Sequence, residues 1–259
     1  MHMHWYDQRL KGIDTGVDDE APIKLFVMGK NTWRNEYEWP LERTEWTKFY
    51  LSSTGNAVDD GGSLSTEIKT SDQTSDSFIY DPKDPVPSIG SQYQTFDFCG
   101  PRDRSHIQLR PDVLTFTTDV LTEDLEITGP ISATVWASSD AIDTDFTATL
   151  TDLEPDGKAI ALCEGIVRAR FRDGTENPQM IIPGKIYKFE IDMWNTSNSF
   201  NKGHRIRIEI SSSNFPRYNR NLNSGNPIAS DTDITIANQT VYHGSKYPSH
   251  INLPLIPAR

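Results

Sequence analysis

The chain has 259 residues, of which 36% are hydrophobic and 24% are charged, so its composition is typical of a globular protein and excludes a disordered one. Its 37 acidic side chains outnumber 25 basic ones, and the resulting net charge of -12 repels a phosphate backbone, which argues against nucleic acid as a partner. Two cysteines are too few for a disulfide scaffold and lack zinc-site spacing, and no run of about 18 apolar residues is present to cross a membrane.

The first dozen residues, MHMHWYDQRLKG, predict a short helix. Met1 and Trp5 are four residues apart, as are Tyr6 and Leu10, and Gly12 is suited to end the helix. The segment has neither the apolar middle nor the small-residue cleavage site of a signal peptide. From these features we expect a cytoplasmic protein.

After this helix the pattern favours β-strands. The run IKLFVMG (23–29) is almost continuously apolar, which is typical of a strand covered on both faces. Three later segments alternate with period two, as in a sheet with one dry and one wetter face: 131–139, 185–193 and 204–211. The turn EPDGK (154–158) between two apolar runs predicts a hairpin. About ten or more strands and one helix predict an all-β fold, most simply a jelly-roll β-sandwich.

Two connecting stretches are long for a compact β domain. Residues 52–75 are rich in Ser, Thr, Gly and Asp, and residues 81–112 are rich in Pro. Loops of this length usually carry function or pack against a partner.

The segment SSSNFPRYNRN (211–221) raises the question of a serine nucleophile. A nucleophile of the α/β-hydrolase type needs a sharp strand-to-helix elbow, usually G-x-S-x-G, and this pattern does not occur in the sequence. Ser211, Ser212 and Ser213 instead follow an alternating strand, and no predicted helix comes after them. We interpret them as the end of a strand whose hydroxyls bind a turn.

The other polar residues identify no catalytic or metal site. Six histidines are scattered, and their spacing indicates no base for a triad. Asp140, Asp143 and Asp145 could bind calcium, but they lack the glycine and terminal glutamate of an EF-hand loop, so turn formation and pairing with arginine is the preferred interpretation. We predict no metal, no cofactor and no catalytic residue.

An aromatic segment, NTWRNEYEWPLERTEW (31–46), follows the first strand. It carries Trp33, Tyr37, Trp39 and Trp46. Such rings could form a sugar-stacking platform or a wedge that fixes this domain to another one. The interface is the preferred interpretation.

Long motifs in this chain resemble the CocE/NonD family of serine hydrolases, which includes cocaine esterase, X-prolyl dipeptidyl aminopeptidases and α-amino acid ester hydrolases. The resemblance covers essentially the whole chain, and the motifs come in the family's order: IKLFVMGKNTWRNEYEWPLERTEWTKFYL, YDPKDPVPSIG, RPDVLTFTTDVL, DTDFTATLTDLEPDGKAIALCEGIVRARF and GHRIRIEISSSNFPRYNRN. In relatives an α/β-hydrolase domain comes first and a jelly roll of the galactose-binding-like type follows. The resemblance therefore implies that residues 1–20 are the last helix and linker of a hydrolase domain absent from this chain, and that 21–259 are the jelly roll.

The resemblance also implies the role of the chain. The Ser-Asp-His triad of relatives lies in the hydrolase domain, so this chain is expected to be inactive alone, to support ester or X-Pro dipeptide hydrolysis by the parent enzyme, and to shape its active-site cleft. The loop that approaches the pocket mouth matches the following residues here: Ser91, Gln92, Tyr93, Gln94, Thr95 and Phe96. The expected contacts with the hydrolase domain are Trp5, Trp33, Trp39 and Trp46.

Further expectations follow from the same resemblance. The segment 211–221 resembles a family signature, in which serines and asparagines satisfy backbone groups, Phe215 and Pro216 pack, and Arg217 and Arg220 pair with acids. A domain interface left uncovered by the absent domain predicts a homo-oligomer formed through the N-terminal helix, the 33–46 segment and the 81–96 loop.

Two alternatives stay open. Galactose-binding-like sandwiches often bind sugars through rim loops, so the chain could be an autonomous carbohydrate-binding module that uses Trp33, Trp39 and Tyr93. A glycoside hydrolase fragment is the less favoured alternative, because 37 acids do not single out the required pair of carboxylates.

Overall fold

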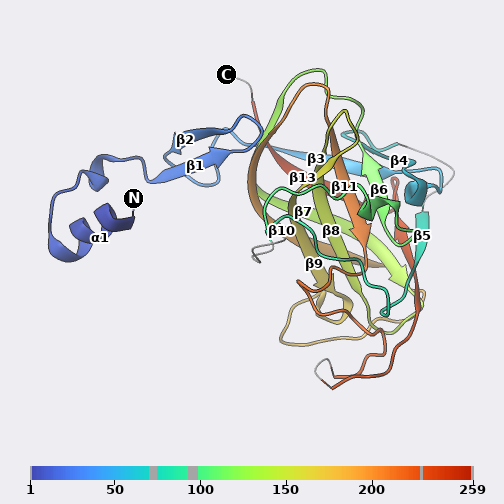
Figure 1. The fold of residues 1–259 in the computed structure, drawn as a ribbon. Coiled ribbons are helices and arrows are strands. Elements are labelled where there is room, and N and C mark those ends of the chain that lie inside the picture. Colours follow the sequence, from blue (N-terminus) through green and yellow to red (C-terminus); the bar gives the residue numbers. More distant parts are fainter. Residues whose placement is uncertain (1, 70–74, 93–98, 228–229, 258–259) are drawn as a thin grey trace.

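A computed structural model describes residues 2–69, 75–92, 99–227 and 230–257 (Figure 1). The helical elements are α1 (His2–Lys11), η1 (Val17–Asp19), η2 (Ala57–Asp59), η3 (Ile107–Leu109) and η4 (Ala169–Phe171). The strands are β1 (Ile23–Val27), β2 (Thr32–Glu36), β3 (Glu45–Ser52), β4 (Gly62–Ser65), β5 (Ser75–Tyr80), β6 (Leu114–Thr117), β7 (Leu125–Ser139), β8 (Asp145–Leu153), β9 (Ala159–Arg168), β10 (Tyr187–Phe200), β11 (Arg205–Ser211), β12 (Ala237–Tyr242) and β13 (His250–Ile256).

The N-terminal part forms an arm that projects from the rest of the chain (Figure 1). It consists of α1, η1 and the antiparallel hairpin β1–β2. The predicted helix is confirmed, and Gly12 ends it in the left-handed region, with φ 68°. The Gln8 side chain then holds the following turn, because its Oε1 accepts the backbone N–H groups of Thr15 and Val17.

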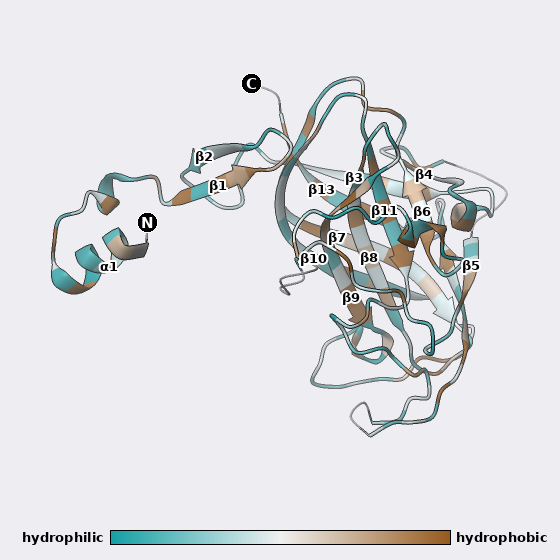
Figure 2. Ribbon diagram, viewed as in Figure 1, coloured by the Kyte–Doolittle hydropathy of each residue, from teal (hydrophilic) through white to brown (hydrophobic). Residues whose placement is uncertain are grey.

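The strand predicted at 23–29 is present as β1, but the expectation that both of its faces are covered is wrong. It pairs only with β2, and Phe26 is 38% exposed despite an edge-on contact with Trp33 across the hairpin. The reason is that the hairpin stands outside the sandwich (Figure 2), so of the apolar residues of β1 only Val27, next to the junction, is buried.

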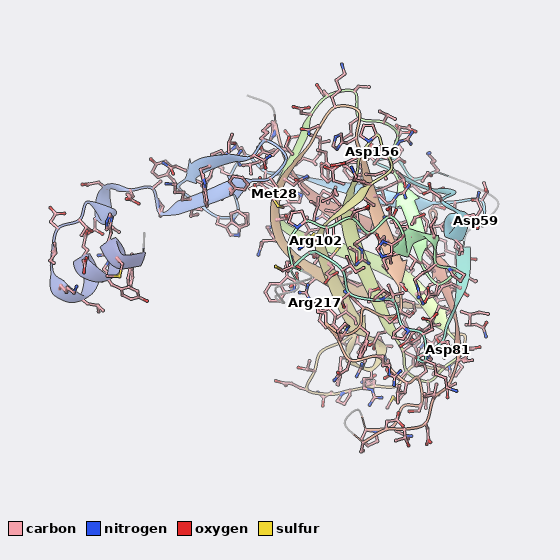
Figure 3. All side chains as sticks on the ribbon, in the orientation of Figure 1. Met28, Asp59, Asp81, Arg102, Asp156 and Arg217 are labelled. Atoms are coloured by element: carbon pink, nitrogen blue, oxygen red, sulfur yellow. The ribbon has the colours of Figure 1, made fainter. Side chains whose placement is uncertain are left out.

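The arm joins the sandwich at Met28 (Figure 3). The Met28 N–H donates to the Ser197 carbonyl at 3.0 Å, and the Ser199 N–H donates to the Met28 carbonyl at 2.8 Å. A Cβ on the next residue, Gly29, would lie 2.0 Å from the Ser199 carbonyl oxygen, so only glycine fits this junction.

The remaining strands form two facing layers. Pairing runs in the order β5-β12-β7-β13-β3-β4-β6-β11-β8-β9, with β10 paired to β7. Strand β3 leads from one layer to the other, because residues 45–50 pair with β13 and residues 50–52 with β4. The rings of Phe146 on β8 and Phe189 on β10 lie 4.8 Å apart although these strands are not neighbours in the pairing order. The predicted all-β sandwich is therefore confirmed.

The period-two alternation of apolar and polar residues predicted for three strands is confirmed, because their apolar side chains face the core between the layers. The buried side chains that face it are Ile131, Ala133, Val135 and Ala137 on β7, Phe189, Ile191 and Met193 on β10, and Ile206, Ile208 and Ile210 on β11. Burial of a side chain of this size stabilises the fold by roughly 1.5–3 kcal/mol. The core thus accounts for the period-two pattern of the sequence.

The opposite face of β11 is not the wetter face that alternation predicts. Arg207 and Glu209 on that face are only 6% and 3% exposed. The segment 103–112, far away in the sequence, lies over them, and the Arg104 guanidinium binds the Glu209 carboxylate at 2.8 Å. β11 is therefore covered on both faces, one apolar and one charged.

The predicted hairpin at 154–158 is confirmed as the turn between β8 and β9, where the Glu154 N–H donates to the Lys158 carbonyl at 2.8 Å. Cys163 on β9 is buried, and burial raises the pKa of its thiol, as suits a small core residue. None of the helices in the described ranges is long and apolar enough to span a membrane.

Candidate functional site

The three adjacent serines at the end of β11 are structural. The Ser211 hydroxyl donates to the Asp112 carbonyl at 2.7 Å, and the Val86 N–H donates to the Ser213 hydroxyl at 2.8 Å. All three are buried, Ser212 completely. Two of the hydroxyls thus fix the long 81–112 segment to the sandwich, and none is exposed to attack a substrate.

The rest of the 211–221 segment follows the predicted pattern with two corrections. Arg217 pairs with the buried Glu164 at 2.6 Å, as predicted. Arg220 instead donates to the Pro82 carbonyl at 2.8 Å, because that loop carbonyl faces it and belongs to no strand ladder. Phe215 is 41% exposed and so packs only in part. Its backbone extends the sandwich, since its N–H donates to the Val86 carbonyl at 2.9 Å.

A serine, an aspartate and a histidine do meet elsewhere in the chain, between the ends of β3, β5 and β12. The Ser53 hydroxyl donates to Asp76 Oδ2 at 2.6 Å, and His243 Nε2 lies 3.0 Å from the same oxygen. In a catalytic triad the imidazole stands between the hydroxyl and the carboxylate. Here the carboxylate stands in the middle and all three residues are buried, so this cluster cannot activate a nucleophile.

Two of the three aspartates that could have bound calcium are paired with arginine, whereas the third, Asp140, accepts hydrogen bonds from Asn238. Asp143 and Arg170 are 2.8 Å apart, as are Asp145 and Arg168, and the Asn221 amide donates to both carboxylates at 2.9 Å. Burial raises the pKa of Asp145, with Arg168 and Asn221 acting in the other direction. Within the described ranges no three His, Cys, Asp or Glu side chains are grouped to hold a metal ion.

The loop predicted to face substrate is described only at its base. Ser91 is buried with φ 62°, and its carbonyl accepts the Gly100 N–H at 3.0 Å. The Gln92 amide donates to the Met193 carbonyl at 3.3 Å and so ties the loop to β10. The other four predicted residues, Tyr93, Gln94, Thr95 and Phe96, lie outside the described residues, and contact with substrate stays a prediction.

Sequence reasoning missed Trp194, which lies directly after the carbonyl that Gln92 binds. It is 58% exposed, has φ 67°, and sits where the β10–β7 register shifts between Asp192 and Asn195. Its N–H donates to Asp192 Oδ1 at 2.8 Å. An Asp two residues before a Trp in an alternating strand is the signal that could have indicated this turn.

The four tryptophans predicted at a domain interface are all exposed, by 42–63%. Trp5 lies on α1, Trp33 on β2, Trp39 in the following turn and Trp46 at the start of β3. They are spread along the arm and its junction rather than gathered into one cluster. Their role at an interface stays a prediction.

A cavity of about 650 Å³ lies between the β8–β9 turn, η3 and the start of β11. Among its lining residues are His106, Leu109, Val120 and Arg205, and the lining within the described ranges contains no Trp, Tyr or Phe. Arg207 at its base already pairs with Asp60 at 2.5 Å and donates to Gln108 at 2.6 Å. The cavity therefore has no aromatic platform on which a sugar could stack.

Comparison with known proteins gives consistent similarities. Residues 15–252 match the family described as the X-Pro dipeptidyl-peptidase C-terminal non-catalytic domain. The chain is 46% identical to cocaine esterase from Rhodococcus sp. (strain MB1 Bresler), over 99% of the chain and 45% of that protein. The structure superposes with a TM-score of 0.85 on an aminopeptidase from a marine sediment Thaumarchaeota archaeon, at 27% identity over 99% of the chain and 43% of that protein. It superposes with a TM-score of 0.84 on an α-amino acid ester hydrolase, at 26% identity over 98% of the chain and 44% of that protein.

Proposed function

Because this chain belongs to the X-Pro dipeptidyl-peptidase C-terminal non-catalytic domain family, we propose that it is the β-sandwich module of a CocE/NonD-type serine hydrolase and that a separate catalytic domain breaks the bond. The chain spans less than half the length of the relatives that it matches. Its proposed substrates are those of the parent enzyme, namely esters or X-Pro dipeptides.

One observation carries this proposal. Over the described residues, the serine, aspartate and histidine that meet are arranged around a central carboxylate and are buried, so this cluster places no exposed nucleophile next to a base. Together with the match to a non-catalytic family, this arrangement supports hydrolysis by another domain.

The supporting role rests on the exposed surface of the arm. Helix α1 and the hairpin β1–β2 carry apolar side chains that no second layer covers, including Trp5, Phe26 and Trp33. A domain interface buries roughly 600–1,500 Å². The catalytic domain would cover these side chains, and the loop fixed to β10 through Gln92 would border its active-site cleft.

The proposal can be tested by two assays done side by side. The purified chain is incubated with ester and aminoacyl-proline amide substrates, and we expect no turnover above buffer. A chimera is then made in which this chain replaces the matching 45% of cocaine esterase, and we expect ester hydrolysis that a serine-directed inhibitor abolishes. Turnover by the chain alone with the same inhibitor sensitivity would contradict the proposal, and so would a folded but inactive chimera.

A further inference from the structure

Trp194 has an unusual backbone conformation for its size. Its φ of 67° lies in the left-handed region, which is an outlier for a bulky side chain, and the ring is 58% exposed. Such conformations persist only where the surroundings hold them, and they gather at functional sites. An exposed ring gains little from packing within this chain, so a contact for the ring must be sought outside it.

The surroundings do hold this conformation. The Trp194 N–H donates to Asp192 Oδ1 at 2.8 Å, and the β10 strand bulges at this point. The Asp192 carbonyl presses against β9 so closely that a Cβ on Gly165 would lie 2.1 Å from its oxygen. The bulge directs the Trp194 ring away from the core.

The base of the 91–96 loop lies next to this bulge. Gln92 donates to the Met193 carbonyl at 3.3 Å, and Gly90 packs so closely on β9 that a Cβ there would lie 3.0 Å from the Ala161 Cβ. Ser91 is a second residue in the left-handed region, with φ 62°. The residues that follow Ser91 and precede Trp194, namely Gln92 and Met193, are therefore joined by one hydrogen bond.

Polar atoms at this place lack partners. The Ser91 hydroxyl and the Gln92 Oε1 are buried, and neither has a hydrogen-bond partner in the part of the chain that the structure describes. A buried polar atom without a partner is unfavourable, and native structures keep few of them. The exposed Trp194 ring nearby matches the composition of an interface hot spot, in which tryptophan is enriched.

We propose that Trp194, together with the adjoining loop base at Ser91 and Gln92, forms a docking surface for the catalytic domain, with the Trp194 ring entering an apolar pocket of that domain. This inference rests on the proposed function. The catalytic domain is the expected occupant, because this chain covers only 45% of the related esterase and the rest of that protein is available to cover the surface.

The test compares one substitution in two contexts. In the isolated chain Trp194→Gly removes an exposed, strained side chain, so we expect its thermal midpoint to stay the same or to rise. In the chimera with the catalytic part of cocaine esterase the same change removes a buried contact, so we expect esterase activity to be lost about tenfold faster at a fixed elevated temperature. Leu109→Ala, at an exposed apolar residue on η3, is the matched control and should change neither value.

Each other outcome overturns the inference. A lower thermal midpoint in the isolated chain together with faster inactivation of the chimera would make Trp194 a residue of the sandwich alone. An unchanged inactivation rate in an active chimera would remove it from the interface while leaving the proposed function intact. A folded wild-type chimera without activity would contradict the proposed function, and this inference with it.

Discussion

Arg104 is the residue at which a single substitution should have its largest effect on stability. Its guanidinium is 2% exposed and lies 2.8 Å from Glu209, whose other carboxylate oxygen accepts the Gln108 amide at 2.8 Å. Arg104→Met leaves the Glu209 charge buried without a cation, which typically costs about 3–5 kcal/mol. Urea unfolding should therefore show a free energy of unfolding lower by about this amount.

The control for this prediction is an exposed ion pair. Lys158 and Asp156 are 2.6 Å apart with both side chains in solvent, so Lys158→Ala should leave the urea midpoint essentially unchanged. Equal midpoints for the two variants would mean that the buried pair does not stabilise this sandwich.

Asp76 should make stability depend on pH. Burial raises the pKa of this carboxyl, but hydrogen bonds from His243, Ser53 and the Ala57 N–H outweigh burial, so its pKa lies below the ordinary value. The folded chain then binds this proton less tightly than the unfolded chain, and the stabilisation is complete above about pH 4 and is lost as the pH falls further. Asp76→Asn should lower the free energy of unfolding at pH 7 by about 1–3 kcal/mol, and the gap to wild type should narrow below pH 4.

A pH series of urea unfolding curves checks this prediction. Asp173→Asn is the control, because that carboxylate is exposed and its stability effect should be small at every pH. A gap between Asp76→Asn and wild type that stays constant from pH 7 to pH 3 would show that folding does not lower the pKa of Asp76.

Among the elements, α1 is the one least supported by tertiary contacts. It has ten residues, whereas an isolated helix shorter than about 12–15 residues is marginal in water. It projects from the sandwich (Figure 1), and within the described ranges its main contact with another element is with η1. In the isolated chain its amides should exchange with solvent at nearly unprotected rates, and in the chimera with the catalytic domain they should become protected.

Hydrogen exchange followed by mass spectrometry measures this difference, with amides of the central strand β7 as the protected reference. Protection of α1 equal to that of β7 in the isolated chain would mean that the helix needs no partner.

The contact of β9 with the β10 bulge gives a second prediction at this scale. Gly165 has no room for a Cβ, since the Asp192 carbonyl oxygen would lie 2.1 Å away, and the obstructing atom is backbone. Gly165→Ala should therefore lower the free energy of unfolding by about 1–3 kcal/mol. Gly157→Ala, in the open β8–β9 turn with φ 91°, introduces strain without crowding and should have the smaller effect. A larger loss for Gly157→Ala would contradict the crowding argument.

The elements also show what the sequence could and could not predict. Ile206, Ile208 and Ile210 revealed their strand and its core face, because burial imposes period two on local sequence. The charged cover over Glu209 could not be predicted, since Arg104 comes from a loop about one hundred residues away. Trp194 was missed in spite of the local signal from Asp192, because the bulge that exposes it depends on the register with β7.

The candidate docking surface was likewise predicted from the sequence only in part. Resemblance to the family indicated the 91–96 loop, while the hydrogen bond from Gln92 to the Met193 carbonyl, which joins that loop to β10, needed the structure. The 23–29 run was correctly predicted as a strand. Its apolar side chains indicated that something covers this strand, but they did not indicate whether the cover is a layer of this domain or a surface of another domain.

For the whole molecule, two properties oppose each other in the absence of a catalytic domain. The arm and its junction expose large apolar side chains, namely Trp5, Tyr6, Trp33, Trp39 and Trp46. Uncovered apolar surface favours association. A net charge of -12 makes copies of the chain repel one another, and this repulsion weakens as salt shortens the Debye length from about 10 Å at 0.1 M to 3 Å at 1 M.

We therefore predict self-association that grows with both protein concentration and salt. Sedimentation velocity of the isolated chain should show the weight-average mass rising between 0.1 and 1 M sodium chloride, because screening removes repulsion and leaves apolar contact intact. The double substitution Trp33→Ser with Trp46→Ser should weaken this rise, and Leu109→Ala, an exposed apolar residue away from the arm, should not. A monomer at every protein concentration and salt concentration would mean that the exposed side chains of the arm do not cause self-association. Association that decreases as salt is added would mean that charge pairing, rather than the arm, holds the copies together.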